Sequence, residues 1–287
     1  MQKRKNKITV GFSSPLRYPG GKTRLANFLW ETIKKNFDKG EKITLVEAYA
    51  GGAGASLKLL FENKVEKLII NDLDKAIFCF WKTAIKNTDF LIKKIKTTHI
   101  NLEERQKQKN IYKNPESKNK DLAFATLFLN RTNYSGIINA GPIGGRQQKS
   151  KWNVQARFNK KIIIERLEKI KKFKNQIEIK NLDGITLLKK LQKNNYFVFL
   201  DPPYYQKGQF LYLNHYVEKD HQDLLKFLEK TSLKWVMTYD NVSYIRNLYE
   251  KFNKKEFTLN HSAFKSKEGK EIIIFADNIE QPSTIKI

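Results

Sequence analysis

Short apolar runs separated by segments with helical spacing recur along the chain. The runs at 42–50, 67–71, 177–183, 197–200, 233–240, 255–261 and 270–278 predict strands, and Gly-rich or polar turns bound most of them. Helical patterns lie between most of these runs. Such alternation predicts an α/β fold, with a Rossmann-like, mostly parallel sheet that an antiparallel hairpin from the last two runs closes.

The chain departs from this alternation in its middle. Residues 76–129 are mostly helical in pattern, with a polar, Lys-rich break at 113–120. A long irregular stretch, Asn139 to Asn159, follows, and loops of this length in compact domains are commonly functional. We therefore expect one catalytic domain formed by 1–84 and 176–287, with an insertion of helices and loops at 85–175.

Charge changes the picture next. The 287 residues contain 55 Lys and Arg against 29 Asp and Glu, a formal net charge of +26. Between Arg146 and Lys180, twelve basic residues face three acidic ones, so the excess is concentrated in and beside the insertion. A basic surface of this kind favours a nucleic-acid partner.

Several other classes of protein are excluded by composition. A single cysteine, Cys79, rules out an internal disulfide and a Cys-based zinc site, and the four histidines lack metal-ligand spacing, so we expect no metal. No apolar run approaches membrane-spanning length, and the N-terminus lacks the apolar core of a signal peptide. We expect a cytoplasmic protein with no membrane partner.

Candidate chemistry begins where the run Phe197 to Leu200 ends, at Asp201-Pro202-Pro203-Tyr204. The prolines fix the backbone and hold the carboxylate where the strand leaves the sheet, which is where open α/β sheets bind ligands. Asp201 and the Pro202 carbonyl can accept both hydrogens of a planar amino group, while Tyr204 stacks on its ring. The alternative is an ordinary solvated Asp in a tight turn.

A second candidate site lies at the first strand, which Gly51-Gly52-Ala53-Gly54 follows. Asp72 ends the next strand, at a distance that suits a carboxylate accepting both ribose hydroxyls of an adenosine cofactor. Glu47 is placed to meet a positively charged amino group. Two alternatives stay open here: Asp72 or Asp74 can cap the following helix, and the sequence does not exclude a dinucleotide.

The segment from Ser14 to Thr23 contains Gly20-Gly21-Lys22-Thr23, which resembles a phosphate loop. A phosphate loop needs a glycine five residues before the Gly of Gly-Lys, and Leu16 stands there. What remains is a Gly-Gly turn at Gly21 whose backbone can approach a ligand, with Lys22 at a helix start and Tyr18 beside it.

The order RYPGGK, EAYAGGAG, NDLD, NRTNYSG and DPPYY resembles the Dam-type family (D12 class, alpha group) of S-adenosylmethionine-dependent DNA adenine-N6 methyltransferases, over nearly the whole chain. The resemblance implies a site-specific enzyme that methylates an adenine flipped out of double-stranded DNA. It also implies a Rossmann-like methyltransferase sheet, a target-recognition insertion, a monomer and a cognate restriction endonuclease as a partner. Other readings are methylation of cytosine N4, of RNA adenine or of a protein glutamine, or a non-catalytic DNA-binding relative.

The resemblance assigns roles to individual residues. It implies catalysis by Asp201, Pro202, Pro203 and Tyr204, and cofactor binding by Tyr18, Gly21, Lys22, Glu47, Gly51, Gly52, Gly54, Asp72 and Asp183. It implies DNA contacts by Arg131, Asn133, Tyr134, Ser135, Asn139 and Arg146, with Tyr134 and Ser135 entering the base stack. Asn139 stands where GATC-specific members have an Arg that reads guanine, so the resemblance does not extend to a GATC target.

Overall fold

The computed structural model describes residues 13–18, 20–191, 195–206, 216–259 and 269–284. The basic N-terminal tail, Pro19, His215 and His261 lie outside these ranges. Within them, one sheet has the strand order β3-β2-β1-β4-β5-β7-β6. The strands are β1 (Thr44–Glu47), β2 (Lys67–Asn71), β3 (Ile177–Lys180), β4 (Tyr196–Leu200), β5 (Lys234–Asp240), β6 (Lys254–Leu259) and β7 (Gly269–Phe275).

The pairing of these strands confirms the predicted fold class. β1 to β5 are parallel to one another, and β7 is antiparallel to both β5 and β6. The first strand is shorter than its apolar run, because the chain turns out of the sheet after Glu47. The run at 255–261 ends as a strand at Leu259, and its last two residues lie outside the described ranges.

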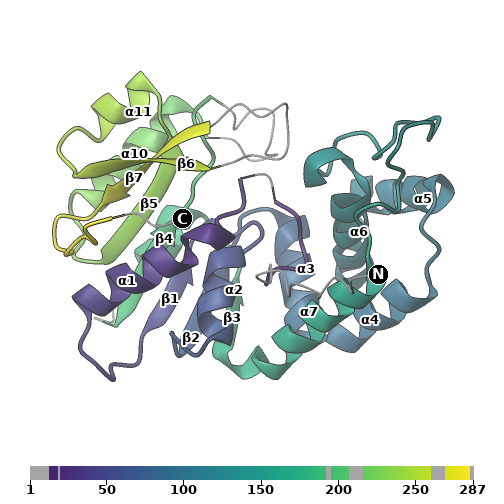
Figure 1. The fold of residues 1–287 in the computed structure, drawn as a ribbon, viewed down its shortest axis with the longest axis horizontal. Helices are drawn as coiled ribbons and strands as arrows, with labels where there is room; N and C mark the ends of the chain where they lie inside the picture. Colours follow the sequence, from purple (N-terminus) through teal and green to yellow (C-terminus); the bar gives the residue numbers. More distant parts are fainter. Residues whose placement is uncertain (1–12, 19, 192–194, 207–215, 260–268, 285–287) are drawn as a thin grey trace, which may run out of the picture.

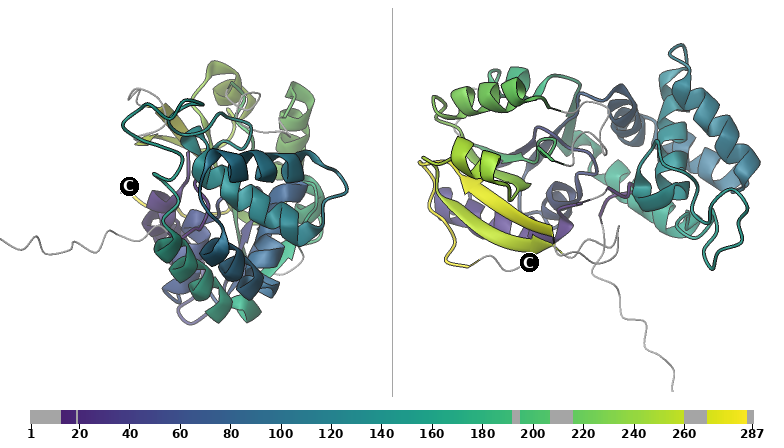
Figure 2. Two further views of the ribbon diagram at one scale, coloured as in Figure 1. Left: turned by 90° about the vertical axis from the view of Figure 1, so that its right-hand side faces the viewer. Right: turned by 90° about the horizontal axis from the view of Figure 1, so that it is seen from above.

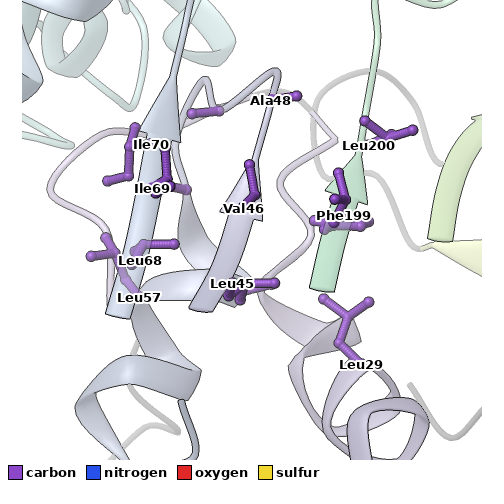
Figure 3. Close-up of a cluster of buried hydrophobic side chains, with 14 of the residues drawn as sticks. Leu29, Leu45, Val46, Ala48, Leu57, Leu68, Ile69, Ile70, Phe199 and Leu200 are labelled. Atoms are coloured by element: carbon purple, nitrogen blue, oxygen red, sulfur yellow. The ribbon is translucent and has the colours of Figure 1, made fainter. Parts of the chain in front are cut away.

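Helices cover both faces of the sheet, as the alternating pattern requires (Figures 1 and 2). On one face, Leu29 and Leu57 pack toward strand residues such as Leu45 and Leu68 (Figure 3). The strand residues of this cluster are buried. Parallel strands with helices on both faces bury successive side chains, which explains the continuous apolar runs. The elements on the two faces are η1 (Thr23–Leu25), α1 (Ala26–Asn36), α2 (Gly54–Phe61), α8 (Gly184–Leu188), α10 (Glu218–Leu228) and α11 (Ser243–Leu248).

A group of helices stands beside the sheet and is called here the helical lobe, residues 88–172 (Figures 1 and 2). α3 (Lys75–Lys86) joins it to the sheet and packs against α4, α6 and α7. The lobe contains α4 (Thr88–Thr97), α5 (Leu102–Lys113), α6 (Asn119–Thr132), η2 (Tyr134–Gly136) and α7 (Lys160–Lys172), after which η3 (Lys174–Gln176) leads back to β3. Between Ile137 and Asn159 no helix or strand forms, as the sequence predicts.

Candidate active site

A cavity of about 360 Å³ opens at the carboxyl ends of β1, β2 and β4. Glu47 and Asp72 reach it from the ends of β1 and β2, and Asp201 from the end of β4. The strands are parallel, so the residues that follow them meet at one edge of the sheet. Other predicted cofactor residues also line this cavity, namely Tyr18, Gly21, Lys22, Gly51, Gly52, Gly54 and Asp183.

The Asp201 carboxylate is held on both oxygens. The Thr238 hydroxyl donates to Oδ1 at 2.6 Å, and Lys22 Nζ lies 3.1 Å from Oδ2. Burial raises the pKa of Asp201, the charge of Glu271 adds to the rise, and Lys22 and Thr238 oppose it. A fifth of this side chain stays exposed, and the residue faces the cavity.

Two further residues fix this network, and sequence reasoning missed both. Thr238 lies in β5, next to β4 in the sheet, and Glu271 lies in β7. Lys22 Nζ is 3.6 Å from Glu271 Oε2 and donates to the Gly20 carbonyl at 2.7 Å. Burial disfavours the Lys22 ammonium, but the two carboxylates outweigh burial and raise the pKa of Lys22. A buried Glu within an apolar strand run was the one available signal for Glu271.

Among the other residues of the Asp-Pro-Pro-Tyr motif, Tyr204 belongs to the same network. Pro203 lines the cavity, whereas Pro202 is buried. The Tyr204 ring is only 9% exposed, and its hydroxyl donates to Glu271 Oε2 at 2.8 Å. Stacking of Tyr204 on a substrate ring stays a prediction.

Glu47 is an unusual carboxyl group. It is buried, and its Oε2 has no hydrogen-bond partner among the described residues. Burial raises the pKa of Glu47 to about 8, and the opposing effects of Ser56 and Lys22 are smaller. A buried carboxyl oxygen without a partner is costly, so the site fits a cationic or hydrogen-bond-donating ligand group.

The structure assigns the cap of α3 to Asp74, and ribose binding by Asp72 stays a prediction. Asp74 caps α3, because its Oδ1 accepts from Ala76 N at 2.7 Å and Ile77 N at 3.3 Å. Asp72 accepts instead from Gly51 N at 2.9 Å and Asp74 N at 3.0 Å, and it faces the cavity. Burial raises the pKa of Asp72 to about 7, with a further contribution from Asp74.

The glycines after β1 are required by neighbours within the chain. Gly51 has φ +45°, and a Cβ there would lie 2.7 Å from the Tyr18 ring. A Cβ on Gly54 would lie 2.2 Å from Thr23 Oγ1. The turn can therefore pack against Tyr18 and the start of η1 while its backbone still lines the cavity. Asp183 caps α8 by accepting from Thr186 N at 3.0 Å.

Hydrogen bonds join the helical lobe to residues 15–17, the segment that leads into this cavity. Asn130 accepts from Arg17 N and donates to Arg17 O, both at 2.7 Å, and it also donates to Gly136 O at 2.9 Å. Arg131 donates from Nε to Pro15 O at 2.6 Å. Burial lowers the pKa of Arg131 to about 9, helped by Arg166 and Arg17.

The predicted DNA-contacting residues divide into two groups. Arg131 and Asn133 are buried, and Asn133 Oδ1 accepts from Arg105 Nε at 2.7 Å while its Nδ2 donates to Ile138 O at 2.6 Å. Asn139 and Arg146 are exposed and Tyr134 is 51% exposed, with Asn139 at the cavity. Ser135 is half-buried at φ 55°.

In the described parts of the chain, no group of three or more His, Cys, Asp or Glu side chains could hold a metal ion, and no helix is long and apolar enough to cross a bilayer. Cys79 is a buried free thiol.

Several known proteins are similar to this chain. The chain is 26% identical over 281 residues to the type II methyltransferase M.MjaIII of Methanocaldococcus jannaschii, covering 88% of this chain and 95% of that protein. Among solved structures, the rRNA methyltransferase aviRa of Streptomyces viridochromogenes is 16% identical, with a TM-score of 0.41 over 96% of this chain and 95% of its own. A putative class I S-adenosylmethionine-dependent methyltransferase of Listeria monocytogenes is 10% identical, with a TM-score of 0.41 over 97% of this chain and 67% of its own.

A family model settles the assignment. The model for D12 class N6 adenine-specific DNA methyltransferases matches residues 18–262. The match spans most of the chain and contains the cavity residues from Tyr18 to Asp201. This protein therefore belongs to the D12 class of N6 adenine-specific DNA methyltransferases.

Proposed function

We propose that this enzyme transfers the methyl group of S-adenosylmethionine to N6 of an adenine flipped out of double-stranded DNA, with Asp201 as the group that receives the amine. One observation carries the proposal: the Asp201 carboxylate faces the cavity from the end of β4 and is held there by Thr238 and Lys22. A fixed carboxylate at this position is built to accept hydrogens from an amino group.

The cavity fits the cofactor. Its volume of about 360 Å³ lies within the range of ligand pockets. Glu47, whose buried Oε2 lacks a partner among the described residues, would hold the amino group of the methionine part. Asp72 would hold the ribose hydroxyls, and Asp183 would lie at the adenine. When bound, the cofactor supplies an electrophilic methyl carbon whose bond to sulfur breaks with its electron pair left on sulfur.

The role of Asp201 follows from the chemistry of adenine N6. The nitrogen lone pair is delocalised into the purine ring, so the amine is a weak nucleophile. Accepting its hydrogens at Asp201 and at the Pro202 carbonyl favours the pyramidal nitrogen, whose lone pair forms the new N–C bond. The nitrogen gains positive charge and then loses a proton. The adjacent carboxylate stabilises that charge, and its raised pKa suits it to accept the proton.

We propose that residues 85–175 form the target-recognition insertion and that 1–84 and 176–287 form the catalytic domain. The helical lobe carries exposed basic and aromatic side chains: Trp152 is 58% exposed, with Lys151 Nζ 5.7 Å and Arg157 Cζ 5.8 Å from its ring. Gln148 holds this loop, since its Nε2 donates to Ile143 O and its Oε1 accepts from Val154 N. Such a surface suits phosphates and bases.

Burial separates the proposed DNA contacts from residues that support them. Arg131 and Asn133 are engaged inside the protein, so we infer that they hold the Tyr134 segment in place and do not reach DNA themselves. Tyr134, Asn139 and Arg146 are the exposed candidates. We also propose a monomer with a cognate restriction endonuclease as its partner, in keeping with the type II designation of the M. jannaschii relative.

Tyr134 and the two polar residues should give different results when replaced. A side chain that fills the space left by a flipped base serves every target, whereas one that reads a base edge serves one base. Tyr134→Ala should slow methylation at all sites with the sequence preference kept.

Asn139→Ala or Arg146→Ala should relax the preference at one position, by about 1–3 kcal/mol. Sequencing of the methylated sites measures both effects. Two polar-residue variants with the parent's preference throughout would place base reading elsewhere.

Cofactor binding should release protons. In the cofactor-free protein, the pKa of Glu47 is about 8 and that of Asp72 is about 7, so both carboxyl groups are largely protonated near pH 6. A cationic amine and donating hydroxyls favour the ionised forms and lower both pKa values, so affinity should rise from about pH 6 to about pH 7.5, where the cofactor amine is still charged. Calorimetry in buffers of different ionisation enthalpy counts the protons. Equal apparent enthalpies in all buffers would contradict this linkage.

Labelled methyl transfer tests the function itself. Duplex DNA is incubated with the enzyme and methyl-labelled S-adenosylmethionine and then digested to nucleosides. The label should be found in N6-methyldeoxyadenosine. Duplexes in which every adenine is already N6-methylated are the matched control and should take up no label. Label in N4-methylcytosine would overturn the proposal, and so would label in an RNA duplex incubated in parallel when the DNA takes up none.

A further inference from the structure

Glu271 joins the parts of the active site that lie far apart in the sequence. It lies in β7, outside residues 18–262 that the family model matches. Its side chain is 2% exposed, and Oε2 both accepts from the Tyr204 hydroxyl at 2.8 Å and lies 3.6 Å from Lys22 Nζ. Lys22 Nζ is in turn 3.1 Å from Asp201 Oδ2 and 5.0 Å from the centre of the Tyr204 ring.

The charges of this cluster explain why a second carboxylate is useful. Lys22 is a buried cation beside the carboxylate that must stabilise positive charge on the target nitrogen. With Lys22 and Asp201 alone the cluster is neutral, and the ammonium opposes the charge that develops during methyl transfer. With Glu271 the cluster carries one net negative charge, which stabilises the positive charge that develops on the target nitrogen.

We propose that Glu271 is a positioning residue of the methyl-transfer reaction: it neutralises Lys22, so that the Asp201 carboxylate can act on the target amine, and it fixes the Tyr204 ring. This inference rests on the proposed function. It adds a residue that influences the reaction through Lys22 and Tyr204, without contacting the reacting atoms.

The pH dependence of the reaction reports this coupling. The charge of Glu271 raises the pKa of Asp201, and Lys22 lowers it. Removing the Glu271 charge should therefore lower the pKa of Asp201, and removing Lys22 should raise it. Among the described residues, the charged and titratable groups around Asp201 and Glu271 are Lys22 before η1, Glu47 in β1, Tyr204 after β4, and Asp240, which pairs in register with Glu271 on the adjacent strand β5.

The decisive variant is Glu271→Gln, which keeps the size of the side chain. We expect kcat to fall about tenfold or more, with little change in the KM for S-adenosylmethionine. The acidic limb of the kcat–pH profile should move to lower pH by about one unit, because Asp201 ionises more readily without Glu271. A loss of packing alone would lower kcat without moving the limb in this direction.

Three further variants complete the experiment. Glu271→Asp keeps the charge and should leave the acidic limb near its parental position. Lys22→Met should move the limb to higher pH, and this measurement tests the coupling even if Glu271→Gln fails to fold. Glu256→Gln is the matched control, because Glu256 is a half-exposed side chain in neighbouring β6 that pairs with Arg246. It should change neither kcat nor the limb.

The failure of this inference is separable from that of the proposed function. If the parent enzyme methylates adenine in DNA but folded Glu271→Gln has the parental kcat and acidic limb, Glu271 has no such role. An unmoved limb in Lys22→Met has the same meaning. If the parent enzyme transfers no methyl group to DNA adenine, the proposed function fails first.

Discussion

Replacement of Asp201 by alanine should reduce methyl transfer about a hundred- to a thousandfold, the range that the loss of one transition-state hydrogen-bonding group gives in other enzymes. The physical reason is that Asp201, in the proposed mechanism, acts on the amine and not on the cofactor. Its Oδ1 and Oδ2 are held by Thr238 and Lys22, so the carboxylate is already oriented before DNA binds. Cofactor affinity should change by only a small factor, because Glu47, Asp72 and Asp183 remain.

Single-turnover rates at saturating cofactor and DNA, with calorimetry of cofactor binding, measure the two parts of this prediction. Asp201→Asn preserves the shape and one acceptor oxygen, and it should be nearly as slow. Asp223→Ala is the control, since Asp223 is a surface residue of α10 paired with Lys226. A variant with weak cofactor binding but normal turnover at saturation would show that Asp201 serves the cofactor instead.

Replacement of Asp72 by alanine should weaken S-adenosylmethionine binding by about 1.5–3 kcal/mol, roughly 10- to 150-fold, the cost of losing charge-assisted hydrogen bonds to the ribose. The carboxylate is available for this role because Asp74, two residues later, already caps α3. Asp72 also accepts from Gly51 N and Asp74 N, so part of the loss should come from a less ordered Gly51 turn.

The neighbouring aspartate provides the comparison for this prediction. Asp74→Ala removes the cap of α3 and should lower the stability of the fold by about 0.5–2 kcal/mol, with a smaller effect on cofactor affinity. Thermal unfolding and calorimetry on both variants separate stability from binding. Unchanged cofactor affinity in a folded Asp72→Ala protein would leave Asp72 with the Gly51 turn as its only role.

Much of the fold could be predicted because the signals are local. A strand buried on both faces gives a continuous apolar run, and the runs ending at Asn71 and Leu200 became β2 and β4 with those ends. The candidate cavity followed from the same logic. Parallel strands present their carboxyl ends at one edge, so residues after β1, β2 and β4 had to meet there.

The α/β class, the strand runs and the three carboxylates at the cavity could thus be predicted from local signals. Three features could be seen only in the folded chain: Asp74 and not Asp72 caps α3, Arg131 and Asn133 point inward, and Thr238 and Glu271 complete the Asp201 network. The reason is that a short window records which residues prefer a strand, a helix or a turn. Contacts such as Lys22 with Glu271 join segments about 250 residues apart, and they exist only once β7 has paired with β5 and brought its carboxylate to the cavity.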